Sequence, residues 1–174
     1  RWAGQCPGRV TLIAPRHPER GPGVVGLGRA AGLTTAQRSK GEILTTGTDI
    51  YVADTMGELG LIYRLAPVVF IGGSLVRDGG QNPIEAAKLG AAILHGPYVS
   101  NFAELYDALD RAHGAEVVAD GERRTAGRGA WMSDPAAAAG MADAARDTGA
   151  GRGGGGDRSR RCVGAELRGR PHRR

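Results

Sequence analysis

Three segments of the chain contain the residue types that proteins use to bind an anionic group. They are residues 15–20 (PRHPER), residues 55–58 (TMGE), and a glycine-rich stretch that leads from 72–74 (GGS) to 82–85 (NPIE). An arginine guanidinium presents a planar fork of N–H donors that matches phosphate or carboxylate, and glycine lets a ligand approach the backbone closely. We therefore predict that these segments bind an anionic ligand such as a phosphate.

Each segment also has a simpler interpretation. Residues 15–20 fit a solvated loop, Thr55 and Glu58 fit a helix cap, and the glycines fit a tight turn before a capped helix. The sequence lacks the lysine-containing loop of P-loop enzymes and the G-x-G-x-x-G spacing of nicotinamide enzymes, so neither class is indicated. Glu85, early in a predicted helix, is well placed to accept hydrogen bonds from ribose hydroxyls.

The spacing of apolar residues predicts strands that alternate with helices. The expected fold class is α/β, with a Rossmann-like parallel sheet and helices on both faces, because short connections join the alternating elements. Such folds bind ligands at the carboxyl ends of their strands, where all three segments fall. The expected strands are 9–14, 33–38, 50–53, 68–71 and 92–94, and the expected helices are 55–64, 83–89 and 101–112.

Several details of these elements are expected from local residue types. Residues 9–14 and 68–71 are predicted to be buried strands, the second covered on both faces. Residues 21–32 contain so many glycines that a short or poorly formed helix is expected there. Asp54 or Thr55 is predicted to cap the next helix, with Glu58 completing a capping box. Pro83 is predicted to begin a helix and Gly90 to end it, because proline is favoured in the first turn of helices and glycine just after their last turn.

The pattern weakens after about residue 120. Asp134 and Pro135 predict a further helix, whereas residues 149–174 form a tail with 8 Arg and a formal charge of +6, against +5 for the whole chain. We predict one nucleotide-sugar domain over residues 1–148, partial after 120, followed by a disordered Arg/Gly-rich tail at 149–174. Two reading-frame slips, near 121–130 and after 148, are our hypothesis for these changes; a natural disordered tail is the alternative.

The remaining composition limits the classes of protein to consider. Cys6 and Cys162 lie near opposite ends without metal-ligand spacing, which predicts two free thiols in a reducing compartment. No apolar run reaches the length of a membrane span, so we expect a soluble chain. The chain starts at Arg1 rather than Met, from which we expect a fragment that lacks an upstream half.

Taken together, the three segments resemble a known family. The stretches APRHPER, DTMGELGLIYRLAPVVFIGGSLV and GGQNPIEAA are similar to the carboxy-terminal, CMP-binding half of bacterial 3-deoxy-D-manno-octulosonic acid (Kdo) transferase. The resemblance covers about residues 9–112, with a trace in 131–147. It implies a glycosyltransferase of the two-domain GT-B architecture that transfers Kdo from CMP-Kdo to lipid IVA, the lipid A precursor. This step of lipopolysaccharide biosynthesis takes place at the cytoplasmic face of the inner membrane.

The resemblance also implies roles for individual residues. The acceptor site, the membrane anchor and the general base belong to the family's amino-terminal half, so no catalytic residue is expected here and this chain alone should be inactive. No metal or other cofactor is implied. Gln81 stands where relatives usually have histidine. The positions that match the family's CMP-binding residues are Pro15, Arg16, Met56, Gly57, Glu58, Asn82, Pro83, Ile84 and Glu85; Gly72, Gly73 and Ser74 form a candidate phosphate loop.

There are two alternatives, one within the enzyme class and one from a different class. One is a GT-B protein that uses a UDP-sugar, such as an epimerase or an N-acetylglucosamine transferase, because the fold alone does not select the nucleotide. The other is a nucleic-acid-binding module that uses the basic tail. We expect no nucleic-acid partner, because the tail lacks aromatic residues for stacking and residues 1–148 carry a formal charge of −1.

Overall fold

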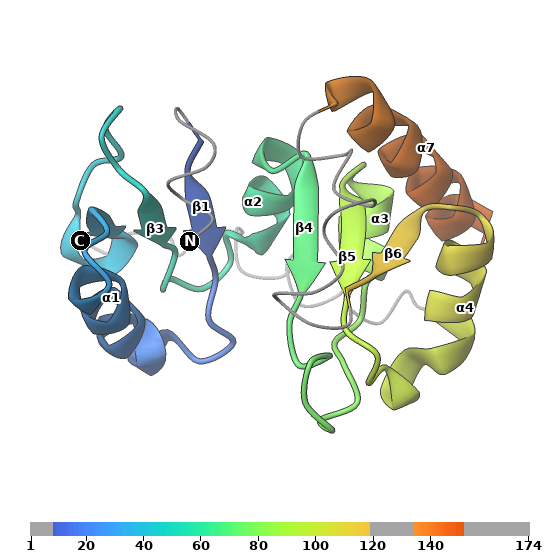
Figure 1. Cartoon of the computed structure of the whole chain (residues 1–174), viewed down its shortest axis with the longest axis horizontal. Helices are drawn as coiled ribbons and strands as arrows, with labels where there is room; N and C mark the ends of the chain where they lie inside the picture. The colour runs from blue at the N-terminus through green and yellow to red at the C-terminus, as the bar shows by residue number, and fades with distance from the viewer. Residues whose placement is uncertain (1–8, 119–133, 152–174) are drawn as a thin grey trace, which may run out of the picture. The chain divides into compact units, whose positions relative to one another are not determined.

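The computed structural model describes residues 9–118 and 134–151. Cys6, Cys162, the first predicted frame slip and the tail beyond residue 151 lie outside the described residues. The chain divides into two compact units, Arg1–Pro67 and Val68–Arg174. Both units consist of parallel strands and helices, so the predicted α/β class is confirmed (Figure 1). The single sheet that we predicted is present as two sheets of three strands, one in each unit.

In the first unit, β3 (Ile50–Val52) lies between β1 (Thr11–Ile13) and β2 (Thr35–Gln37). All three strands are parallel, and the last residues Ile13 and Gln37 both pair with Val52. The carboxyl ends of the strands therefore meet at one edge of the sheet. The predicted strand at 9–14 is present, but it is exposed to half-buried rather than buried, whereas β2 is buried throughout.

A helix is present where one was predicted: α1 (Gly21–Ala30) has 10 residues and packs against β2 and β3, but it is regular rather than poorly formed. Gly21 faces the side chain of Asp54, and Gly28 faces Thr35 so closely that a Cβ atom would be 2.6 Å from its hydroxyl. These two glycines let the helix approach the sheet. The favourable packing therefore outweighs their low helix propensity.

In the second unit, β5 (Ala92–His95) lies between β4 (Val68–Ile71) and β6 (Ala115–Val117), again with parallel pairing. Residues 68–71 form a strand, as predicted. The prediction that both faces of this strand are buried is wrong, because Phe70 is 42% exposed. The strand that is buried throughout is β5. The sequence analysis did not predict β6.

The helices of the second unit cover β5 and β6. Helices α3 (Ile84–Lys88) and α7 (Pro135–Gly151) pack on each other and on β5, while α4 (Ala103–Arg111) packs on β6 and α7 (Figure 1). The buried face of α7 is made of small residues, which allows close contact with α3. Its members are Ala138, Ala142, Ala145 and Gly149.

Helix α7 confirms one prediction about this region and corrects another. The Asp134 side chain accepts a hydrogen bond from the Ala136 N–H at 2.8 Å, as expected of a cap before Pro135. The helix continues to Gly151, so the first three residues of the predicted disordered tail are helical. Gly149 is buried against Ala87, and this packing extends the helix beyond the predicted boundary.

Short 3-10 turns and one further helix complete the described chain. None of its helices is long and apolar enough to cross a membrane. The additional elements are η2 (Pro18–Arg20), η3 (Arg38–Lys40), α2 (Leu59–Leu65) and η4 (Ser100–Phe102).

Candidate functional site

The loop after β1 presents an exposed cation at the carboxyl edge of the first sheet. Pro15 is half-buried and Arg16 is exposed. Within the described ranges, the Arg16 guanidinium has no hydrogen-bond or ion-pair partner. The position therefore leaves its N–H donors available to an anion.

The loop after β3, residues 54–58, lies next to it because β1 and β3 are paired up to Ile13 and Val52. Helix α2 begins at Leu59, later than predicted, and has no side-chain cap. The predicted capping box is therefore wrong: the Thr55 hydroxyl bonds to the Glu58 carboxylate instead of to the backbone. Met56 is 79% exposed, and Gly57 has a φ of +85°, a conformation that favours glycine.

Glu58 forms a two-point ion pair with Arg38, which follows β2. The distances are 2.6 Å from Arg38 Nη2 to Glu58 Oε1 and 3.1 Å from Nε to Oε2. The hydrogen bond from Arg38, followed by that from Thr55, lowers the pKa of the Glu58 carboxyl below its usual value. Glu58 is therefore ionised at neutral pH, and its charge is balanced by a neighbouring arginine.

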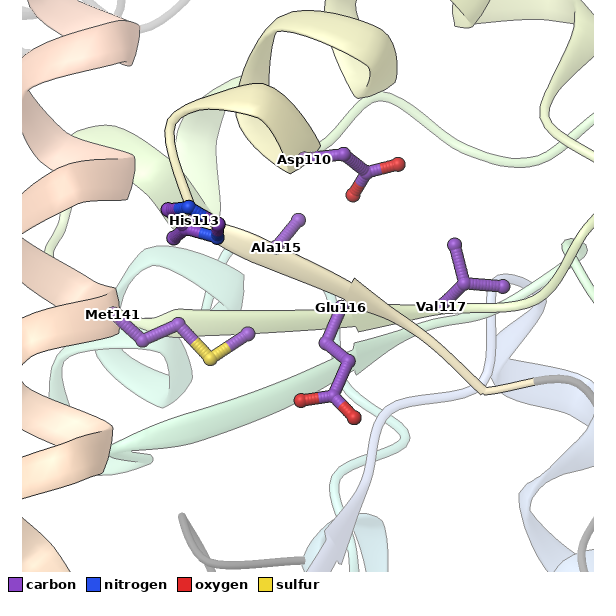
Figure 2. A pocket seen from close by; sticks show the side chains of 6 residues that line it. All are labelled: Asp110, His113, Ala115, Glu116, Val117 and Met141. Carbon is purple, nitrogen blue, oxygen red and sulfur yellow. The ribbon is translucent and has the colours of Figure 1, made fainter. Parts of the chain in front are cut away.

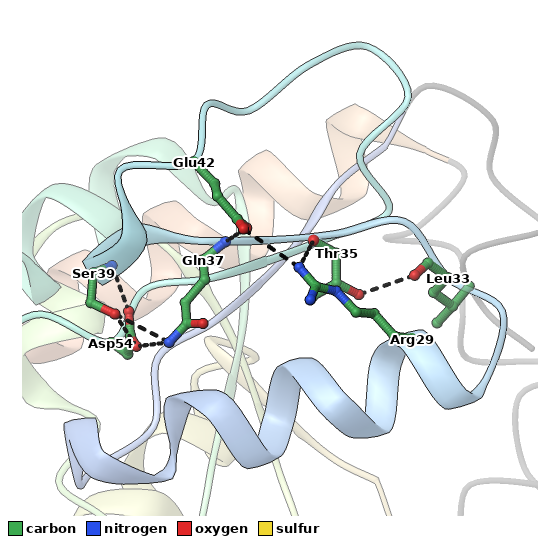
Figure 3. A network of polar contacts seen from close by, with 7 residues as sticks. All are labelled: Arg29, Leu33, Thr35, Gln37, Ser39, Glu42 and Asp54. Carbon is green, nitrogen blue, oxygen red and sulfur yellow. Dashed lines mark hydrogen bonds and ion pairs between the residues drawn. The ribbon is translucent and has the colours of Figure 1, made fainter.

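Asp54, at the start of the same loop, is a buried carboxylate with three donors (Figure 3). It accepts hydrogen bonds from Gln37 Nε2 at 2.6 Å, from the Ser39 hydroxyl at 2.7 Å and from the Ser39 N–H at 2.9 Å. Burial opposes its charge, but these hydrogen bonds outweigh burial and lower the pKa of Asp54. Asp54 was one of two predicted helix caps, with Thr55 as the other, but it instead connects the ends of β2 and β3.

These lowered pKa values predict acid sensitivity. The pKa of each of these carboxyl groups is lower in the folded protein than in the unfolded chain, where it is about 4. Above about pH 4 the ionised group therefore contributes its full stabilisation of the fold. This stabilisation is lost as the pH falls through the folded-state pKa. We expect the free energy of unfolding, measured by urea titration, to fall as the pH is lowered below about 4. Ser39→Ala, which removes one donor to Asp54, should reduce this pH dependence.

Ser100→Ala is the matched control, because Ser100 is exposed and its side chain makes no hydrogen bond or ion pair among the described residues. It should leave the pH dependence as it is in the unaltered chain. An equal pH dependence in the Ser39→Ala and unaltered proteins would show that the hydrogen bonds to Asp54 do not hold its pKa down.

In the second unit, the candidate phosphate loop follows β4. Ser74 is fully buried, and its hydroxyl donates to the Ile71 carbonyl at 2.6 Å and accepts from the Gly96 N–H at 2.8 Å. Ser74 thereby connects the ends of β4 and β5. Gly72 is exposed and Gly73 half-buried, so these two residues are the accessible part of the candidate loop.

The NPIE segment begins helix α3, as predicted. The Asn82 side chain accepts a hydrogen bond from the Ile84 N–H at 2.9 Å, and the side chain of Pro83 is fully buried. Glu85 is exposed, and its carboxylate has no partner in the described part of the chain. Asn82 and Glu85 are thus accessible, whereas Pro83 supports the turn.

The sequence analysis missed two buried residues near this segment, Tyr106 and His95. Tyr106 donates a hydrogen bond to the Gln81 carbonyl at 2.6 Å, and its ring lies 4.4 Å from that of His95. His95 contacts Asp110 Oδ1 at 3.0 Å and the Gly96 carbonyl at 2.8 Å. The position of His95 at the end of a parallel strand was the available signal, because such ends carry site residues.

A pocket of about 400 Å³ lies beside β6 and α7 in the second unit (Figure 2). None of the predicted site residues lines it. Its lining residues are Asp110, His113, Ala115, Glu116, Val117 and Met141. The pocket is therefore separate from the loops in which the sequence placed the ligand.

The predicted residues divide between the two units, and within each unit the structure gathers them. Residues 15–16 and 56–58 lie on adjacent loops of the first unit, and residues 72–74 and 82–85 lie on the glycine-rich connection of the second. In the ranges 9–118 and 134–151, no group of three or more His, Cys, Asp or Glu side chains is arranged to hold a metal ion. The fold is of the parallel α/β class, in which ligands generally bind at the carboxyl ends of the strands.

Comparison with known proteins identifies the family. No protein-family model matches the chain. It is 38% identical over 144 residues to 3-deoxy-D-manno-octulosonic acid transferase from Bordetella pertussis, which covers 80% of the chain and 33% of the relative. It is 40% identical over 113 residues to the probable mitochondrial 3-deoxy-D-manno-octulosonic acid transferase of Arabidopsis thaliana, covering 64% of the chain and 25% of the relative.

A solved structure matches the fold as well as the sequence. The C-terminal CMP-Kdo binding domain of WaaA from Acinetobacter baumannii superposes with a TM-score of 0.77 at 30% identity, covering 84% of this chain and 77% of that domain. The chain belongs to the Kdo transferase family, and it corresponds to the C-terminal domain of that family. It spans a quarter to a third of the length of the curated relatives described above.

Proposed function

We propose that this chain is the donor-binding part of a Kdo transferase and that its ligand is CMP-Kdo. The observation that carries the proposal is the match to a CMP-Kdo binding domain at 30% identity. It is combined with accessible Arg16 on the loop after β1 and accessible Asn82 and Glu85 at the start of helix α3. The complete enzyme would transfer Kdo from CMP-Kdo to lipid IVA in lipopolysaccharide biosynthesis, at the cytoplasmic face of the inner membrane.

In this proposal the phosphate of CMP-Kdo is bound by the loop that follows β1 in the first unit. During transfer a hydroxyl oxygen of the acceptor forms a bond to the anomeric carbon of Kdo and its proton passes to the general base. The bond between that carbon and the phosphate breaks, and CMP leaves with the additional negative charge. Arg16 would donate hydrogen bonds to the phosphate and stabilise this charge. A single phosphate paired with an arginine needs no divalent cation, so we include no metal or other cofactor. The exposed Glu85 carboxylate would accept hydrogen bonds from the ribose hydroxyls.

Catalysis and acceptor binding are assigned to residues outside this chain. We propose that the general base, the lipid IVA site and the membrane contact are in the amino-terminal half of the GT-B enzyme, and that this chain alone transfers no Kdo. A fusion to the amino-terminal half of the Bordetella pertussis relative would test this division. Kdo transfer to lipid IVA by the fusion and none by the chain alone is the expected result.

The choice of nucleotide is tested by calorimetry on the full 174-residue chain. We expect CMP to bind with a lower Kd than UMP or UDP, because the chain is similar to a CMP-Kdo binding domain. Tighter binding of UDP would favour a GT-B enzyme that uses a UDP-sugar. The absence of binding to any of the three nucleotides would overturn the donor-binding role itself.

A further inference from the structure

Residues 54–58 form a loop that is fixed at both ends and exposed at its tip. Asp54 is buried and hydrogen-bonded, and Glu58 is held in a two-point ion pair, whereas Met56 between them is 79% exposed. Both ends of this loop are bound by one segment of the first unit, residues Gln37–Ser39 at the end of β2. Figure 3 shows the Asp54 end of this arrangement.

The strand order places this segment on the opposite side of the loop from Arg16. Strand β3, which leads into the loop, lies between β1, which leads to Arg16, and β2, which leads to Arg38. Two arginines therefore flank the loop, but they differ in their contacts. Arg16 has no partner among the residues described, whereas Arg38 bonds to the Glu58 carboxylate with two of its nitrogens.

The contacts of Glu58 limit what its carboxylate can still do. A carboxylate offers about four acceptor positions, and Arg38 together with the Thr55 hydroxyl occupies three of them. About one position remains for a hydroxyl or N–H donor of a ligand. Arg38 also balances the negative charge of Glu58, which would otherwise repel an anionic nucleotide bound at the same loop.

We propose that Arg38 is a positioning residue of the donor site: it fixes the Glu58 carboxylate in one orientation and neutralises its charge, so that the 54–58 loop can accept an anionic nucleotide. This inference rests on the proposed function of the loop. It assigns a role to a residue outside the segments in which the sequence analysis placed the site.

A double-mutant cycle separates this role from direct contact between Arg38 and the ligand. The four proteins are the unaltered chain, Arg38→Ala, Glu58→Gln and the double variant, and the probe is CMP in an NMR titration that reaches millimolar Kd values. We expect Arg38→Ala to raise Kd by at least about threefold, as for coupled residues in one network. In the Glu58→Gln background the same change should have a much smaller effect, because the neutral amide leaves Arg38 no carboxylate charge to neutralise and no two-point ion pair to form.

Arg29→Ala is the matched control, because Arg29 also pairs with a glutamate of the first unit, Glu42, at 3.5 Å. It removes the same charge without touching the 54–58 loop and should leave Kd unchanged. A second readout needs no ligand: the ¹³C signal of the Glu58 carboxyl should titrate at higher pH in Arg38→Ala than in the unaltered chain, because Arg38 lowers the pKa of Glu58.

The outcomes distinguish this inference from the proposed function. CMP binding by the unaltered chain, with an equal loss from Arg38→Ala in both backgrounds, would mean that Arg38 contacts the ligand directly and would overturn the inference alone. An unchanged Kd in Arg38→Ala would overturn it as well, as would an unchanged Glu58 titration. No CMP binding by the unaltered chain would overturn the proposed function and, with it, this role.

Discussion

Arg16→Ala should weaken CMP binding by about 1.5 to 3 kcal/mol, which is about a 10- to 150-fold rise in Kd. The reason is that hydrogen bonds to a charged group contribute this much, and the exposed Arg16 guanidinium has no partner within the described chain that would compete with a phosphate. Calorimetry or NMR titration of the 174-residue chain with CMP measures the change.

Arg9→Ala is the control for this prediction. Arg9 precedes β1 and Arg16 follows it, so the two substitutions remove the same charge from opposite ends of one strand. Arg9 is also exposed. A similar loss of affinity in both variants would indicate that only the net charge of the chain matters, and Arg16 would then have no place in the site. An unchanged Kd in Arg16→Ala would also exclude Arg16 from the site.

Two alanine substitutions in helix α1 should change stability in opposite directions. Gly26→Ala should stabilise the protein by about 0.5 to 1 kcal/mol, because alanine favours the helix and a Cβ atom there meets no atom within 4 Å. Gly21→Ala should destabilise it by about 1 to 3 kcal/mol, because its Cβ would overlap the Asp54 side chain, which is buried and hydrogen-bonded.

The free energy of unfolding from urea titration at pH 7 measures both effects. Each variant is the control for the other, since both replace glycine by alanine within one helix, and Gly21 already has helical backbone angles. Equal stabilisation by the two substitutions would show that the contact between Gly21 and Asp54 does not limit the packing of α1. Gly21→Ala should also weaken CMP binding, because Asp54 fixes one end of the 54–58 loop.

Local sequence patterns predicted most strands and loops because each depends on neighbouring residues. Continuous apolar runs indicated β1, β3, β4 and β5, and their carboxyl ends located the loops that carry Arg16 and Gly57. Pro83 and Gly90 marked helix α3 to within one or two residues. These signals need no knowledge of the tertiary structure.

The errors arose where distant residues decide the structure. The glycines of α1 indicated a weak helix, but Gly28 is favourable there because of its contact with Thr35 in a strand that follows. The Thr55 and Glu58 spacing indicated a capping box, but Arg38 binds Glu58 from another loop. Strand β4 appeared more buried than β5 because the sequence does not show where α7 packs. Sequence patterns alone could not supply these contacts.

The packing of α7 has a consequence for synthesis of the protein. This helix covers β5 and α3, yet 39 residues lie between β5 and Pro135 along the chain, and 46 lie between α3 and Pro135. In the first unit, by contrast, the last strand of the sheet along the chain is β3, which ends at Val52. During translation the first unit can therefore fold early, whereas the second exposes its apolar surface until the ribosome has released the residues up to Gly151.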